Sequence, residues 1–97
     1  MTSKQRAYLK GLASTMDVIV HIGKASITPE LVISVQEALE ARELVKVGVL
    51  KNCADDPKEI AQIISERTRS QIVHVIGKKI VLYKESKNKP KIKLPLL

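Results

Sequence analysis

A chain of 97 residues with 44% hydrophobic residues and a net charge of +7 is long enough for one domain with one modest core. Its apolar runs are far shorter than the roughly 20 residues that a membrane-spanning helix needs, and no apolar segment follows the N-terminal basic residues as in a secretory signal. We therefore expect a cytoplasmic protein that does not interact with membranes.

The positive charge is concentrated at the two ends of the chain. Residues 1–24 hold four basic side chains and one acidic one, residues 25–76 hold six and eight, and residues 77–97 hold seven and one. A surface that binds a polyanion needs several cations facing one backbone, so this segregation favours a nucleic-acid partner. Basic ends that merely keep a small domain in solution explain the charge equally well.

The first predicted element is an amphipathic helix over residues 3–15. Thr2 opens a capping-box pattern, and apolar residues then recur with helical spacing. Arg6 and Lys10 lie one turn apart beside this apolar stripe. Gly11 costs about 1 kcal/mol relative to Ala inside a helix, which indicates a close packing contact, the favoured interpretation, or a close approach by a partner's backbone.

A short strand is predicted over residues 17–22, because this segment is apolar and rich in β-branched residues. The helix that follows has Thr28 as its N-cap and Pro29 at its first position. Its predicted buried face comprises four apolar residues, Leu31, Val35, Ala38 and Leu39.

The second predicted strand covers residues 44–50, and its alternation places Lys46 on an exposed face. The opposite face holds three valines, Val45, Val47 and Val49. Asp56 followed by Pro57 opens a third helix. The buried side of that helix is predicted to hold Ile60, Ile63 and Ile64.

Two further strands are predicted over residues 72–76 and 80–83, and a hairpin turn at residues 77–79 joins them. The element order is therefore α-β-α-β-α-β-β. Right-handed crossovers align the first three strands and the hairpin reverses the fourth. We predict a two-layer α/β fold with helices packed on a mixed four-stranded sheet.

The last part of the chain is rich in lysine and poor in apolar residues. We therefore assign residues 1–84 to one domain and residues 85–97 to a basic, mostly extended tail. Within that tail, Ile92 and Leu94 are apolar enough to dock as an edge segment.

The sequence offers little support for catalysis. His21 and His74 lie in predicted strands, where histidines usually pack or lie at an edge, and no serine or cysteine nucleophile is spaced with a base. Cys53 has no second cysteine for a disulfide and no clustered histidines for a metal site. We expect no enzymatic activity, no metal or other cofactor, and no small-molecule substrate.

The segment HIGKASITPE, residues 21–30, is the most informative junction in the chain. Gly23 permits a backbone conformation closed to other residues, and Lys24 supplies a mobile positive charge. The amides of residues 25–30 lead into a helix N-terminus, which attracts anions, although Glu30 partly offsets that attraction. The sequence therefore indicates a junction that admits a phosphate.

Four segments that cover nearly the whole chain, in order, carry the pattern of a known family. They are TSKQRAYLKGLA, VIVHIGKASIT, EALEARELVKVGVL and HVIGKKIVLYKESKNKPKIKLP. Together they resemble the CRM (chloroplast RNA splicing and ribosome maturation) domain, in particular its single-domain bacterial YhbY-like members. The resemblance implies an RNA-binding fold related to the C-terminal domain of bacterial translation initiation factor three, with the fourth strand between the second and the third.

The resemblance also implies an RNA-contacting Gly-x-x-Gly loop, which falls on Gly23, Lys24, Ala25 and Ser26. Ser26 replaces the second glycine, enters positive φ less easily and adds bulk beside the backbone. Its hydroxyl is able to donate to a phosphate oxygen instead. For bacterial members the resemblance further implies association with precursors of the large ribosomal subunit.

We therefore expect a non-catalytic, monomeric RNA-binding protein that acts on ribosomal RNA during large-subunit assembly. Besides the loop, the expected contacts are Arg6, Lys10, Lys46, Lys78 and Lys79. Since the chain has only two aromatic residues, both tyrosines, shape and phosphate contacts should dominate over base stacking. Two alternatives stay open: a DNA-binding architectural protein, and a protein-interaction adaptor whose basic tail meets an acidic partner.

Overall fold

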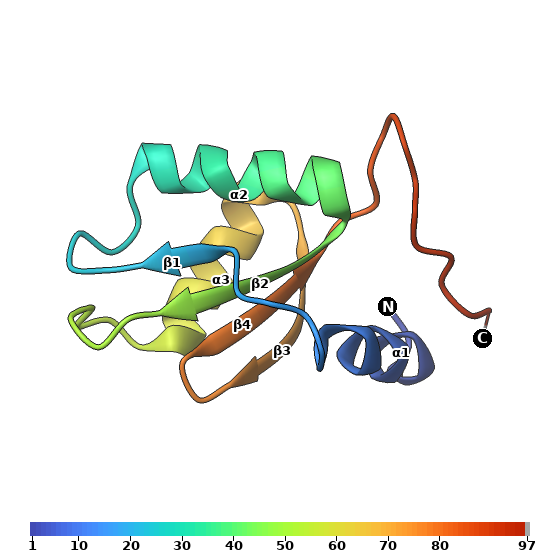
Figure 1. Ribbon diagram of the computed structural model, residues 1–97, viewed down its shortest axis with the longest axis horizontal. Coiled ribbons are helices and arrows are strands. Elements are labelled where there is room, and N and C mark those ends of the chain that lie inside the picture. Colours follow the sequence, from blue (N-terminus) through green and yellow to red (C-terminus); the bar gives the residue numbers. More distant parts are fainter. Residues whose placement is uncertain (97) are drawn as a thin grey trace.

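The computed structural model describes residues 1–96, which form three helices and one four-stranded sheet (Figure 1). The helices are α1 (Ser3–Ala13), α2 (Pro29–Arg42) and α3 (Pro57–Thr68). The strands are β1 (Val20–Ile22), β2 (Leu44–Val49), β3 (Gln71–Ile76) and β4 (Lys79–Tyr83). The element order agrees with the predicted order, and the main differences are a shorter first strand and a first helix that ends at Ala13.

Each helix begins directly after the residue predicted to cap it. Thr2 Oγ1 accepts the N–H of Gln5 at 3.1 Å, and the Gln5 side chain accepts the N–H of Thr2 at 3.0 Å, which completes a capping box. Thr28 Oγ1 accepts the N–H of Leu31 at 3.1 Å, and the Asp56 side chain caps α3. These local bonds fix where the helices start and hence how the loops before them leave the sheet.

The strands lie in the order β1-β2-β4-β3. β1 runs parallel to β2, whereas β4 pairs antiparallel with both β2 and β3. β4 therefore lies between β2 and β3, as the family resemblance implied. The prediction of an α/β fold with a mixed four-stranded sheet is confirmed.

The sheet face toward α2 and α3 carries the larger core. Its strand residues include the predicted valines Val45, Val47 and Val49, together with Ile80 and Leu82. The helices add Val35 and Leu39 from α2 and Ile60 and Ile64 from α3. The prediction that Ile63 is buried is wrong, because its side chain is 40% exposed beside the stripe that Ile60 and Ile64 define.

α1 covers part of the opposite, outer face of the sheet, so a third and incomplete layer adds to the two predicted. Leu9 and Ala13 of α1 pack on strand residues Leu44, Val73, Val81 and Tyr83. A Cβ atom at Gly11 would meet nothing within 4 Å, so the packing interpretation of this glycine is wrong. Gly11 lies on the open surface of α1.

Residues 84–96 form neither helix nor strand, and they lead back past the end of α2 toward α1, where Gln5 Nε2 donates to the carbonyl oxygen of Pro95 at 3.1 Å (Figure 1). The buried carboxylate of Glu43, at the end of α2, accepts the backbone N–H groups of Ser86, Lys91 and Ile92 at 2.7, 2.6 and 2.6 Å. Ile92 and Leu94 pack against the outer core cluster rather than extending the sheet. These contacts fix the path of the segment.

Candidate nucleic-acid interface

The four residues Gly23, Lys24, Ala25 and Ser26 form a tight turn between β1 and α2. The N–H of Ser26 donates to the carbonyl oxygen of Gly23 at 2.9 Å, and Lys24 and Ala25 are exposed at the tip. Ser26 has a φ of +56°, in the left-handed region that favours glycine, whereas Gly23 does not have a positive φ. The strained conformation therefore falls on the serine and not on the glycine.

The Ser26 side chain is bound to the neighbouring loop. Its hydroxyl donates a hydrogen bond of 2.5 Å to Oδ2 of Asp55, in the segment between β2 and α3. The hydroxyl that was expected to meet a phosphate is therefore already engaged by a carboxylate. This contact joins the two loops and also places a negative charge against the turn that carries Lys24.

The start of α2 offers fewer free amides than the sequence suggested. Pro29 has no N–H group, and the N–H of Leu31 is capped by Thr28. The N–H of Ser26 closes the turn onto Gly23. The exposed tip of the turn, with Lys24, is therefore better placed to attract an anion than the start of α2.

Three loops meet at this end of the sheet (Figure 1). The N–H of Leu50 donates to the carbonyl oxygen of Ile22 at 2.8 Å, and the N–H of Val49 donates to the carbonyl oxygen of Lys78 at 2.7 Å. These bonds hold the turn with Lys24 on one side of β2 and the β3–β4 hairpin with Lys78 on the other. Both lysines are exposed.

A groove of about 320 Å³ opens on the outer face of the sheet beside the C-terminal turn of α1. We name it the lysine groove, and it is lined by Lys10, Ala13, Ser14, Lys46, His74, Ile76, Lys79 and Val81. Three lysines, a histidine and a serine supply its polar side chains, and no carboxylate is among the lining residues. Such a hollow is suited to an anionic ligand that also has an apolar part.

The strand register explains why these side chains share one face. One row across β2, β4 and β3 contains Lys46, Val81 and His74. Two residues further along the strands, toward the hairpin, the same face carries the pair Lys79 and Ile76. Sequence reasoning named Lys46 and Lys79 but missed His74 and Ile76. In the sequence of β3, His74 and Ile76 alternate with Val75, which packs against the larger core. This alternation is the sequence signal that would have placed both residues on the outer face.

Two of the predicted contact residues hold α1 on the sheet. Lys46 Nζ donates to the carbonyl oxygens of Ala13 at 3.0 Å and Met16 at 3.2 Å. The prediction that Lys46 is exposed is wrong, because this half-buried residue bonds the carbonyl oxygen of Ala13 at the end of α1, where the dipole favours a cation, and that of Met16 beyond it. Arg6 donates to the carbonyl oxygens of Ile72 at 2.5 Å and Val73 at 3.0 Å, at the register shift in β3.

The structure thus sorts the predicted basic residues into three places. Lys10, Lys46 and Lys79 come together in the lysine groove. Lys24 and Lys78 lie in loops on either side of β2 at the hairpin end of the sheet. Arg6 lies one helical turn from Lys10, with its guanidinium group bound to β3.

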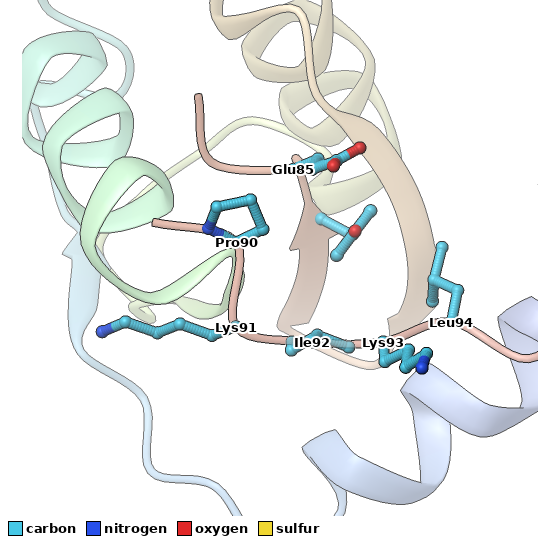
Figure 2. A pocket seen from close by; sticks show the side chains of 7 residues that line it. Glu85, Pro90, Lys91, Ile92, Lys93 and Leu94 are labelled. Carbon is cyan, nitrogen blue, oxygen red and sulfur yellow. The ribbon is translucent and has the colours of Figure 1, made fainter. Parts of the chain in front are cut away.

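A second hollow, of about 420 Å³, lies beside Tyr83 at the opposite end of β4 and is lined mostly by the C-terminal segment (Figure 2). Figure 2 shows Lys91 and Lys93 pointing away from each other, and Lys91 Nζ donates to the carbonyl oxygen of Ala41 at 2.6 Å. Burial, with the charges of Glu43 and Glu85, raises the pKa of Tyr83. This hollow does not gather cations as the lysine groove does.

Three further features of residues 1–96 bear on other kinds of function. No group of three or more His, Cys, Asp or Glu side chains in this part of the chain is placed to hold a metal ion. No helix in the described part is long and apolar enough to cross a membrane. Cys53 is a buried free thiol.

Comparison with known proteins identifies the family. The family model of the CRS1/YhbY (CRM) domain matches residues 1–84. "Probable RNA-binding protein YqeI" from Bacillus subtilis is 43% identical over 95 residues, which cover 98% of this chain and 99% of that protein. An "RNA-binding protein" from Haemophilus influenzae is 33% identical over 95 residues, with coverages of 98% and 95%.

A solved structure gives the same answer at the level of the fold. The solution structure of the protein SAV1595 from Staphylococcus aureus superposes with a TM-score of 0.82 at 48% sequence identity. The match covers 98% of this chain and 99% of that one. The chain therefore belongs to the CRS1/YhbY (CRM) domain family.

Proposed function

We propose that this protein binds RNA without catalysing a reaction, and that its contact surface joins the lysine groove to the loops that carry Lys24 and Lys78. The observation that carries this proposal is the convergence of Lys10, Lys46 and Lys79 on one groove that no carboxylate lines. Several cations that face one polyanion gain affinity from counterion release. The names of the two relatives support RNA as that polyanion.

The chemistry of the surface favours phosphate contacts over base stacking. Of the two tyrosines, Tyr83 is buried, and Tyr8 on α1 is 44% exposed outside the residues that line the groove. Lysine ammonium groups recognise phosphates as point charges and carry little sequence information. The protein should therefore select its target mainly by shape and by the local structure of the RNA.

We propose further that the target is ribosomal RNA in precursors of the large ribosomal subunit, and that the protein acts as a cytoplasmic monomer. The resemblance of its loop and strand segments to the bacterial YhbY-like CRM proteins supports this assignment. The short, exposed turn at Lys24 and Ala25 suits a site on a large folded RNA, since it is able to reach a backbone that a flat surface would not.

Two measurements test the proposal. Competition between a structured ribosomal RNA fragment and duplex DNA of equal charge, at one salt concentration, should favour the RNA, and equal preference would indicate the DNA-binding alternative. Sedimentation of a lysate should place the protein with large-subunit precursors at low salt and release it at high salt. A protein that stays at the top of the gradient at both salt concentrations would contradict the ribosomal assignment.

The loop and the tail need separate variants. Lys24→Glu should weaken RNA binding without unfolding the domain, because the side chain is exposed at the turn. Removal of residues 85–97 tests the adaptor alternative, which predicts that the deletion abolishes all binding. The RNA-binding proposal predicts only partial loss after this deletion, provided that circular dichroism shows the remaining domain to be folded.

A further inference from the structure

We propose that the lysine groove holds one unstacked nucleotide of single-stranded RNA, with its base against Ile76 and its phosphate on Lys10 and Lys79. This inference rests on the proposed function and adds the structural class of the RNA. A surface that meets only the backbone of a duplex needs cations but no apolar hollow. The lysine groove has both, so its occupant should be an anion with an exposed apolar face.

The apolar part of the groove contains one side chain that is well exposed to solvent. Ile76, the last residue of β3, has a side chain that is 58% exposed. Val81 and Ala13 also line the groove, but each is only 3% exposed, so Ile76 supplies most of the exposed apolar surface there. Exposed apolar area bounded by cations is a common mark of a ligand-binding surface. A nucleobase that has left its stack presents the flat apolar face that would cover Ile76.

The three lysines of the groove differ in their surroundings, because one is hydrogen-bonded to the backbone and two are exposed. Lys46 Nζ is held by the carbonyl oxygens of Ala13 and Met16. Lys10 and Lys79 are exposed and enter the groove from α1 and from the start of β4. The absence of any carboxylate among the lining residues within 1–96 favours an anionic occupant, and two free ammonium groups on different elements suit one phosphate group.

His74 is placed to contact the edge of the base. Its half-buried side chain lines the groove, and it pairs across the sheet with Val81. A neutral imidazole offers one donor and one acceptor, so it is able to hydrogen-bond a base edge whose own pairing partner is absent. A fully paired base would not expose that edge. The groove volume of about 320 Å³ is at the lower end for small-ligand sites, which suits one nucleotide rather than a helix.

The test uses the full-length protein and two RNAs of equal length and charge, one a perfect duplex and the other a hairpin with an unpaired loop that contains 2-aminopurine. Ile76→Ser should weaken binding of the loop RNA roughly five- to tenfold and abolish the fluorescence change of the 2-aminopurine. It should leave duplex affinity and the salt dependence unchanged. Ile33→Ser is the matched control, since Ile33 is 53% exposed on α2, and it should change nothing.

His74→Ala is the second variant, and it should also reduce binding of the loop RNA while sparing the duplex. Thermal unfolding of each variant shows whether the fold is kept. If Ile76→Ser and His74→Ala affect both RNAs equally, or neither, the nucleotide site is refuted while RNA binding stands. If the wild-type protein binds neither RNA, the proposed function itself fails. Displacement of both RNAs by an acidic, leucine-containing peptide, with no preference for the loop RNA, would assign the groove to a protein partner and overturn the inference.

Discussion

The hydroxyl of Ser26 donates a hydrogen bond of 2.5 Å to the Asp55 carboxylate, so the residue at the second glycine position of the loop fastens that loop to its neighbour. Ser26 holds a φ of +56° there, which a non-glycine residue adopts at a cost of about 1 kcal/mol. The bond offsets that cost and keeps Lys24 in a fixed turn. It also brings a negative charge to a surface that we propose to meet phosphates.

Asp55→Asn should tighten RNA binding about two- to threefold at low salt. The amide oxygen still accepts the Ser26 hydroxyl, whereas the negative charge beside the Lys24 turn is removed. Titration of a structured RNA at two salt concentrations measures the effect, which should shrink at the higher one. Glu59→Gln, an exposed charge change in the first turn of α3, is the control. Unchanged or weaker binding by Asp55→Asn would remove the loop from the interface.

Lys46→Gln should destabilise the fold, whereas Lys10→Gln should not. The Lys46 ammonium group bonds the carbonyl oxygens of Ala13, at the end of α1, and of Met16, and its loss should lower the free energy of unfolding by about 1 kcal/mol. Lys10 is exposed on α1, so its substitution should reduce RNA affinity with little change in stability. Urea unfolding and RNA titration of both variants separate the two roles. Equal stability losses in the two variants would contradict this assignment.

Glu43→Gln should loosen the C-terminal segment. The carboxylate accepts three backbone N–H groups from residues 86–92 in a fully buried position, and an amide replaces one of its acceptor oxygens by a donor. We expect a loss of about 1–3 kcal/mol in the free energy of unfolding and faster amide hydrogen exchange at Ile92. Glu37→Gln, on an exposed position of α2, is the control and should leave both measurements unchanged.

The same carboxylate should make stability depend on pH. Burial alone raises the pKa of Glu43, but the backbone N–H groups of Ser86, Ile92 and Lys91 and the Lys91 charge outweigh it and hold the pKa below its ordinary value. Since the folded pKa is lower than the unfolded one, this stabilisation is complete above the unfolded pKa and is lost as pH falls through the folded pKa. Unfolding between pH 6 and 3 should therefore show a smaller loss in Glu43→Gln than in wild type. Identical pH profiles would refute the role of Glu43.

Local patterns predicted the elements of this fold because their causes lie within a few residues. The caps at Thr2, Thr28 and Asp56 and the alternation of β2 all depend on neighbours in the chain. The position of β4 between β2 and β3 came from the family resemblance, since no local pattern encodes strand order.

The contacts that define the candidate site could not be predicted in this way. The Ser26–Asp55 bond joins residues 29 apart, and the bond from Lys46 to Ala13 joins residues 33 apart. The alternating pattern of β2 places Lys46 on the outer face of the sheet whether its side chain ends in water or at the end of α1. Its role therefore depends on where α1 packs. His74 and Ile76 line the groove because α1 leaves this part of the outer face uncovered, and the sequence does not encode where α1 packs.

If lysines from separate elements act together on one RNA, the salt dependence of binding should change when the groove lysines are removed. RNA affinity of wild type and of Lys10→Gln/Lys79→Gln is measured over a tenfold range of salt, with Lys58→Gln/Lys87→Gln as the control of equal charge. We expect that the groove double variant binds RNA more weakly and that its log–log slope falls by roughly 0.7 for each phosphate that is no longer neutralised, while the control keeps the wild-type slope. Equal slopes in all three proteins would contradict this expectation.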